Sequence, residues 1–134
     1  LLSNGEELKA RRMLVATGGL KKGPILEFIR KLGHSIEPLA PSLFTFSIKD
    51  SFLKGLQGIS VECCEAAIPE TRLVQTGPLL VTHTGLSGPV ILKLSAWGAR
   101  WIQDQSYRFS CDINWTATWT QAETRDRLKQ ERTY

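Results

Sequence analysis

The residues best suited to chemistry lie in one short segment, 82–88, which reads Thr-His-Thr-Gly-Leu-Ser-Gly. His83 is its only ionisable side chain, and an imidazole can donate a proton near neutral pH or orient a substrate carbonyl. Alternatively, the ring of His83 is hydrogen-bonded into the turn and holds its shape. Thr82 and Thr84 are possible hydrogen-bond partners in either case. His83 and Ser87 have no acidic residue near them in the sequence, so the segment does not predict a Ser/His/Asp nucleophile.

The residues around this segment predict a strand-to-helix elbow. An apolar strand at 79–81 enters it, and Gly85 permits the positive φ of a chain reversal. A helix is expected to start at Ser87 or Gly88, with Pro89 in its first turn. Free backbone N–H groups at that helix end would suit an anionic or polar ligand group. The predicted substrate-facing residues are Thr82, His83, Gly85, Ser87 and Gly88.

The elbow also resembles that of one protein family. Residues 32–43 and 55–61 resemble two more segments of that family, and residues 13–19 resemble the strand and turn that return to the flavin in flavoproteins with two dinucleotide folds. The chain therefore resembles the HI0933/BaiN-like NAD(P)/FAD-dependent oxidoreductases over about residues 8–115. The matching elbow residues are Thr82, His83, Gly85, Leu86, Ser87, Gly88, Pro89, Ile91, Leu92, Leu94 and Ser95.

This resemblance implies FAD as the cofactor, with NAD(P)H as a possible hydride source. The backbone of Thr17, Gly18 and Gly19 would then contact the flavin, because glycines permit close approach. The alternative for these three residues is a plain strand-ending turn. The implied partners are the flavin and a small-molecule substrate, both bound through the rest of the parent chain. The alternative function is a stand-alone, non-catalytic β-barrel binding module that has lost flavin binding.

The sequence departs from the family pattern where the cofactor should bind. The Gly-x-Gly-x-x-Gly turn that holds the FAD pyrophosphate is absent, and the loop after Gly19 is several residues shorter than the family's. The chain starts at Leu1 rather than Met, and Asn4-Gly5 reads as the turn of a hairpin entered in mid-strand. We therefore expect an internal piece of a FAD-dependent oxidoreductase that is inactive by itself.

The predicted fold class is α+β. Residues 1–38 are expected to form the end of a Rossmann-like FAD-binding domain, and residues 39–119 a small antiparallel β-barrel insert domain with one buried helix. Residues 120–134 are expected to form a polar helix that leads to a further C-terminal region. These assignments combine the resemblance with the change from helical to alternating periodicity near residue 40.

Hydrophobic periodicity predicts the individual elements. Apolar residues recur at helical spacing in 24–32 and 87–102, and Thr120 with Glu123 forms a capping box for a last helix. In the second helix, Ile91, Leu94, Trp97 or Gly98, and Trp101 are expected to face inward. The expected strands, which alternate or are short and apolar, cover residues 13–16, 43–48, 59–64, 72–76, 79–82 and 107–115.

Composition and charge narrow the remaining possibilities. With 42% hydrophobic and 22% charged residues, the 134-residue chain is an ordinary globular protein that can hold one core. It has no apolar run of the ~20 residues that span a membrane, and no membrane partner is expected. The net charge is +4, with basic residues gathered at 9–31 and 125–132. Because no stacking aromatics interleave with them, solvated helix faces are favoured and nucleic acid is not an expected partner.

The cysteines and histidines do not predict a metal or disulfide site. Cys63, Cys64 and Cys111 form no disulfide framework, and a reducing compartment is favoured. There is no Cys-x-x-Cys pair and the two histidines are far apart, so no metal site is predicted. We expect a cytoplasmic protein, or alternatively one of an organelle matrix or stroma.

Overall fold

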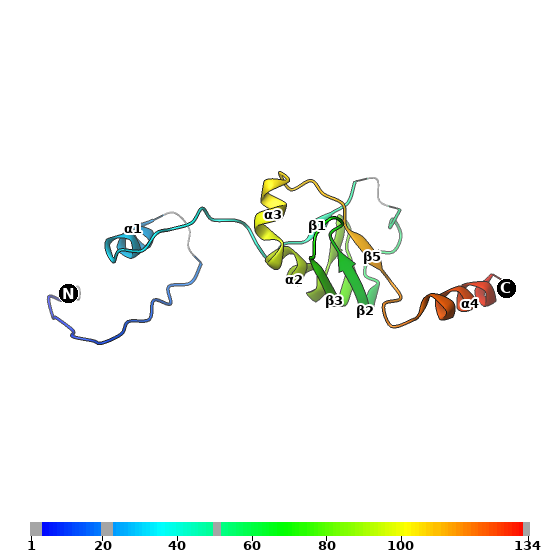
Figure 1. Cartoon of the computed structure of the whole chain (residues 1–134), viewed down its shortest axis with the longest axis horizontal. Helices are drawn as coiled ribbons and strands as arrows, with labels where there is room; N and C mark the ends of the chain where they lie inside the picture. Colours follow the sequence, from blue (N-terminus) through cyan, green and yellow to red (C-terminus); the bar gives the residue numbers. More distant parts are fainter. Residues whose placement is uncertain (1–3, 20–22, 50–51, 133–134) are drawn as a thin grey trace. The chain divides into compact units, whose positions relative to one another are not determined.

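The computed structural model describes residues 4–19, 23–49 and 52–132 (Figure 1). The chain divides into two compact units, Leu1–Pro38 and Leu39–Tyr134. The described sheet lies in the second unit. The assignment of residues 1–38 to a Rossmann-like flavin-binding domain, and of 39–119 to an insert domain, stays a prediction.

The first unit contains one described helix, α1, Pro24–Lys31. Pro24 occupies its first turn, where the missing N–H costs no hydrogen bond, and Gly33 follows its end with a φ of +88°. The helix predicted at 24–32 is therefore confirmed. The strand predicted at 13–16 is wrong, because no strand is described there and Leu14 is 89% exposed. A strand needs a neighbour to pair its N–H and C=O groups, and the described residues of this unit offer none.

The second unit is built on a curled antiparallel sheet. Its strands are β1 Phe46–Ser47, β2 Ser60–Ala67, β3 Val74–Val81, β4 Gly85–Ser87 and β5 Asp112–Asn114. They are hydrogen-bonded in the order β1-β4-β3-β2-β5, so β1 and β5 are the two edges. The described strands thus form a half-barrel, and the predicted α+β fold with a small antiparallel barrel is confirmed at this level.

The central strand β3 decides a point that the sequence leaves open. Residues 72–76 and 79–82 are compatible with one strand or two, and the structure has one continuous strand over 74–81, through Gly77-Pro78. The pairing of β2 with β3 shifts register between Val61 and Cys64, which face Leu79 and Gly77. Pro78 therefore lies opposite an irregularity in the ladder, where its missing N–H interrupts no regular hydrogen bond.

Two consecutive helices replace the single helix predicted at 87–102. They are α2, Pro89–Trp97, and α3, Ala99–Asp104, and they meet at Gly98. A Cβ at Gly98 would lie 3.0 Å from the Leu94 carbonyl oxygen, so a glycine is well suited to this junction. Of the two residues proposed to face inward here, Gly98 is buried, whereas Trp97 is 75% exposed.

The core of this unit lies between the sheet and α2. α2 contacts β3 and β2, and Val90, Ile91 and Leu94 are fully buried, which confirms one buried helix. The last helix, α4, Gln121–Glu131, has no buried residue. Its predicted capping box is confirmed: Glu123 N–H donates to Thr120 Oγ1 at 3.2 Å, and Thr120 N–H donates to Glu123 Oε2 at 2.7 Å.

Candidate functional site

The segment at 82–88 forms the tip of a β-hairpin rather than a direct strand-to-helix elbow. The short strand β4 lies between the turn and α2, and it pairs with both β3 and β1. Thr82 N–H donates to the Gly85 carbonyl oxygen at 2.8 Å, and Gly85 N–H donates to Thr82 Oγ1 at 3.1 Å. A Cβ at Gly85 would overlap the carbonyl oxygen of Phe46. Gly85 is therefore required by the close approach of β1.

Gly88 is the N-cap of α2, and it is one of the two residues, Ser87 and Gly88, at which the sequence predicts the helix to start. It has a φ of +98°, and a Cβ there would lie 2.8 Å from the Pro78 carbonyl oxygen. Ser87 makes no capping hydrogen bond. Val90 and Ile91, which follow Pro89, are fully buried, so this end of the helix packs against the sheet. A ligand role for its N–H groups stays a prediction, and this burial weighs against it.

His83 is exposed at the tip of the hairpin. The turn is held by the backbone and hydroxyl of Thr82, and the His83 ring has no hydrogen bond within the described part of the chain. A role in holding the turn is therefore not seen for His83. The sequence predicts that five residues of this segment face a substrate, and that role stays a prediction for Thr82, His83, Gly85, Ser87 and Gly88. Of these, His83 is exposed and Gly85 is buried.

The predicted flavin-contacting residues lie in the other unit. Thr17, Gly18 and Gly19 are all exposed, and Gly18 has a φ of +76°. A Cβ added to Gly18 or Gly19 would meet no atom within 4 Å. These residues thus form an open turn, and contact with a flavin stays a prediction for them.

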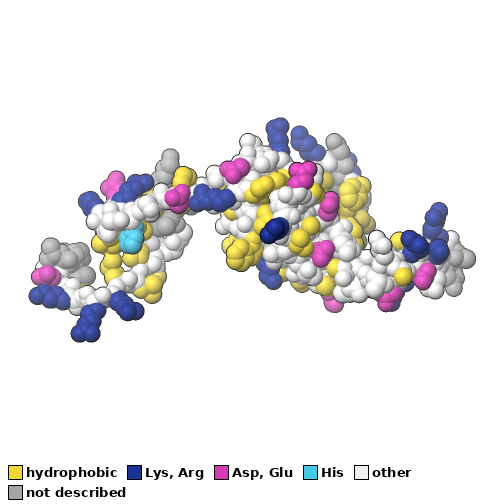
Figure 2. Space-filling model, viewed as in Figure 1, with side chains coloured by type: hydrophobic (Ala, Val, Ile, Leu, Met, Phe, Trp, Pro, Cys, Tyr) yellow, Lys and Arg dark blue, Asp and Glu magenta, His cyan; other side chains and the backbone are white. Residues whose placement is uncertain are grey.

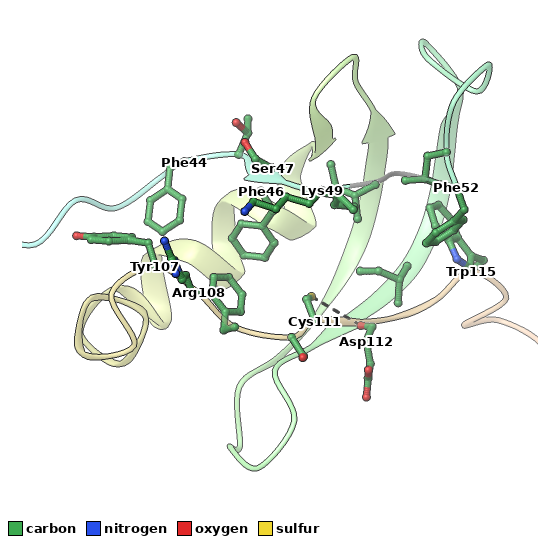
Figure 3. Close-up of a pocket in the computed structure, with 17 residues that line it drawn as sticks. Phe44, Phe46, Ser47, Lys49, Phe52, Tyr107, Arg108, Cys111, Asp112 and Trp115 are labelled. Carbon is green, nitrogen blue, oxygen red and sulfur yellow. Dashed lines mark hydrogen bonds between the residues drawn. The ribbon is translucent and has the colours of Figure 1, made fainter.

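A large aromatic groove, which the sequence did not predict as a site, lies in the second unit (Figure 3). It has a volume of about 1100 Å³ and runs between residues 44–49 with 52–53 on one side and residues 107–115 on the other. Since β1 and β5 are the edges of the sheet, the groove occupies the open side of the half-barrel. Its aromatic lining consists of Phe44, Phe46, Phe52, Tyr107, Phe109 and Trp115.

Aromatic contacts join the two sides of this groove. The rings of Phe46 and Phe109 meet edge to face with centroids 5.0 Å apart, and those of Phe44 and Tyr107 at 6.0 Å. The side of the groove that contains Phe44 is also attached to α2, because Phe44 N–H donates to the buried hydroxyl of Ser95 at 3.0 Å. These contacts hold the two edges of the half-barrel together without a backbone ladder.

The other side of the groove, residues 107–115, begins with a strained turn. Ser106 and Tyr107 have φ values of +52° and +60°, although neither is a glycine. Tyr107 N–H donates to the Ile102 carbonyl oxygen at 2.9 Å, which ends α3 in a left-handed cap. The turn directs residues 107–111 along the groove and leaves Tyr107 45% exposed.

The polar groups of the groove suit binding rather than nucleophilic catalysis. Burial, and then the charge of Asp112, raises the pKa of the Cys111 thiol to about 11. The Cys111 thiol is therefore mostly protonated at physiological pH and is poorly suited to act as a thiolate nucleophile. The cations lining the groove are Lys49 and Arg108. No group of His, Cys, Asp and Glu in the described residues could hold a metal ion.

The comparisons with known proteins identify the family. Residues 40–134 match the family described as HI0933-like protein barrel and H2TH domain. The chain belongs to this family. The match confirms the family resemblance, and the half-barrel agrees with the barrel of that description. None of the described helices is both long and apolar enough to cross a membrane.

Two curated relatives have the same name, ribosomal RNA dihydrouridine synthase. The Haemophilus influenzae protein (strain ATCC 51907 / DSM 11121 / KW20 / Rd) is 31% identical over 100 residues, and the Escherichia coli (strain K12) protein is 27% identical over 105. These alignments cover 69% and 70% of this chain but 24% and 25% of the relatives. The chain thus spans about a quarter of their length. No solved structure matches it significantly.

Proposed function

We propose that this HI0933-like chain is part of a FAD-dependent oxidoreductase that reduces a uridine of ribosomal RNA. The family membership and the shared name of the two relatives support the proposal. Because the chain spans about a quarter of those relatives, the activity is proposed for the whole protein. Forming dihydrouridine adds two hydrogens across a carbon–carbon double bond, and a flavin supplied by NAD(P)H is a suitable source of reducing equivalents.

The described residues do not by themselves form a flavin site. Thr17, Gly18 and Gly19 form an exposed turn with open space around both glycines, and no Gly-x-Gly-x-x-Gly turn is present to hold a pyrophosphate. We therefore assign the main FAD contacts to the rest of the parent protein. At most, the backbone of these three residues contributes one wall of the cofactor site.

The aromatic groove is the structural observation that most supports an RNA substrate. The sequence argued against nucleic acid because the basic clusters at 9–31 and 125–132 lack interleaved aromatics. The groove instead places aromatic rings beside Lys49 and Arg108, which lie outside both clusters. This combination of flat apolar rings and cations is typical of surfaces that bind unpaired bases.

The alternative function is a β-barrel binding module without flavin. A groove formed entirely by the second unit is compatible with it, because binding would then need no cofactor. The two functions differ in their spectra. A flavoprotein absorbs visible light as oxidised flavin and is bleached on reduction by NAD(P)H, whereas a binding module is colourless.

The proposal is tested on the full-length parent protein and its gene. We expect the purified protein to carry FAD, and ribosomal RNA from a deletion strain to lose the mass of two hydrogen atoms at one uridine. The 134-residue chain alone should show no FAD binding in a fluorescence titration. A colourless full-length protein, or unchanged ribosomal RNA in the deletion strain, would contradict the proposed function.

A further inference from the structure

We propose that the aromatic groove binds a short single-stranded segment of RNA. Bases would stack on Phe52 and Tyr107, and phosphates would lie beside Lys49 and Arg108. The choice of RNA rests on the proposed function, but the position of the site rests on the groove itself. The sequence did not predict this site, although Leu86 of the segment 82–88 lies in its lining.

The first support is the exposure of two aromatic rings. Phe52 is 80% exposed and Tyr107 is 45% exposed, whereas Phe46 beneath them is 7% exposed. Figure 3 shows Phe52 and Tyr107 near opposite ends of the groove. An exposed ring offers a face on which any base can stack. Two such rings at opposite ends would bind different bases of one extended strand.

The second support is the position of the cations. Lys49 and Arg108 are exposed, and neither forms an ion pair with another described residue. In Figure 3 both charged groups point toward the end of the groove that holds Tyr107, and Asp112 points away from the rings. Figure 2 shows side chains of both charges, Lys and Arg as well as Asp and Glu, next to hydrophobic side chains on the surface of the larger unit. An anionic strand could therefore follow the groove with its phosphates near these cations.

The third support is the strained backbone that presents Tyr107. Ser106 and Tyr107 both adopt the left-handed region, which is unfavourable for residues with a Cβ. Strain of this kind concentrates at binding and catalytic sites. Here it places a large, partly exposed ring beside the groove instead of returning it to the core.

The geometry favours a single strand over a duplex. Stacking on Phe52 and Tyr107 requires base faces that are free, and bases inside a duplex are covered by their neighbours. A duplex could meet Lys49 and Arg108 only through its phosphates. Duplex RNA and inorganic polyphosphate are therefore the competitors that distinguish stacking from charge alone.

The test is fluorescence anisotropy of the 134-residue chain with a labelled, single-stranded uridine-rich oligonucleotide. We expect Phe52→Leu with Tyr107→Leu to weaken binding roughly tenfold or more, because two stacking faces are lost. Lys49→Gln with Arg108→Gln should weaken binding and reduce its dependence on salt concentration. The matched controls are Trp97→Leu, which removes a 75%-exposed ring on α2, and Arg72→Gln, which removes an exposed cation. Both controls should bind within about twofold of the unmodified chain.

Several outcomes would overturn the inference. One is that the chain does not bind the RNA, and another is that the groove variants bind it as well as the controls do. A third is that polyphosphate or duplex RNA displaces the labelled strand as efficiently as an unlabelled single strand does. Circular dichroism of each variant establishes that it is folded. Loss of dihydrouridine in the deletion strain, together with unaffected groove variants, would reject the groove and keep the proposed function. RNA binding that depends on the groove, with unchanged ribosomal RNA in the deletion strain, would keep the groove and reject the proposed function.

Discussion

The hairpin at 82–88 and the aromatic groove differ in how their residues are used. In the hairpin, glycines allow close backbone approach: Gly85 lies against β1, and Gly88 lies against Pro78 of β3. In the groove, side chains from distant segments meet across the open side of the half-barrel, and two rings remain exposed. The most distinctive sequence segment is thus explained largely by packing, whereas the surface best suited to a ligand has no contiguous motif.

The largest effect is expected for Gly88→Val. The new side chain would meet the Pro78 carbonyl oxygen and would require an unfavourable positive φ. We expect it to lower the free energy of unfolding by more than about 3 kcal/mol, measured by urea denaturation. The matched control is the neighbouring Ser87→Ala, which should cost about 0.5 kcal/mol or less because Ser87 makes no capping hydrogen bond. Similar losses for the two variants would contradict the packing role of Gly88.

The floor and the rim of the groove should respond differently to truncation. Phe46 is 7% exposed and packs edge to face against Phe109, so Phe46→Ala should cost about 3 kcal/mol of unfolding free energy. Phe52 is 80% exposed, and Phe52→Ala should change stability by less than about 0.5 kcal/mol. Thermal or urea unfolding of both variants measures the difference. A large loss of stability for Phe52→Ala would show that this ring is structural and not free to stack.

A smaller effect is expected from the titration of Cys111. Burial first, and Asp112 second, raise the pKa of its thiol from 9.0 to about 11. The folded state therefore keeps a proton that the unfolded chain loses between those values, so this contribution is complete below pH 9 and disappears toward pH 11. We expect the free energy of unfolding to fall more steeply over this interval for the unmodified chain than for Cys111→Ala. Cys63→Ala is the control, and equal slopes for the chain and Cys111→Ala would exclude the effect.

The smallest effect on stability is expected for His83→Gln. The ring is exposed and has no hydrogen bond within the described residues, so the free energy of unfolding should change by less than about 0.5 kcal/mol. In the full-length protein we expect most turnover to remain. A loss of turnover of about 100-fold, with the fold and the flavin spectrum unchanged, would instead identify His83 as a proton donor.

Local chain chemistry was sufficient to predict several elements of the fold. Pro24 and Pro89 mark the first turns of α1 and α2, and the Thr120–Glu123 capping box starts α4. The barrel-like sheet followed from alternating apolar residues. The strand at 13–16 was wrong because an apolar sequence can favour an extended chain but cannot supply the neighbouring strand that it needs.

The groove could not be derived in the same way. Phe44 and Tyr107 meet only because the sheet curls and α3 ends before the second segment returns. The left-handed backbone at Ser106 and Tyr107 had no sequence signal, since neither residue is glycine or asparagine. Alternating aromatics at 44–46 and 107–109 were the available signal, but they are equally typical of a buried strand.

Whether the groove or the hairpin tip binds RNA is tested most directly by NMR. The isotopically labelled 134-residue chain is titrated with single-stranded uridine-rich RNA, and the shifts of its amide signals are measured. The shifts should concentrate in residues 44–49 and 107–115, whereas those of His83 and Thr84 at the tip of the hairpin should be nearly unchanged. Shifts that concentrate at His83 and Thr84 while residues 44–49 and 107–115 remain unaffected would contradict this assignment, because they would place the ligand at the hairpin tip.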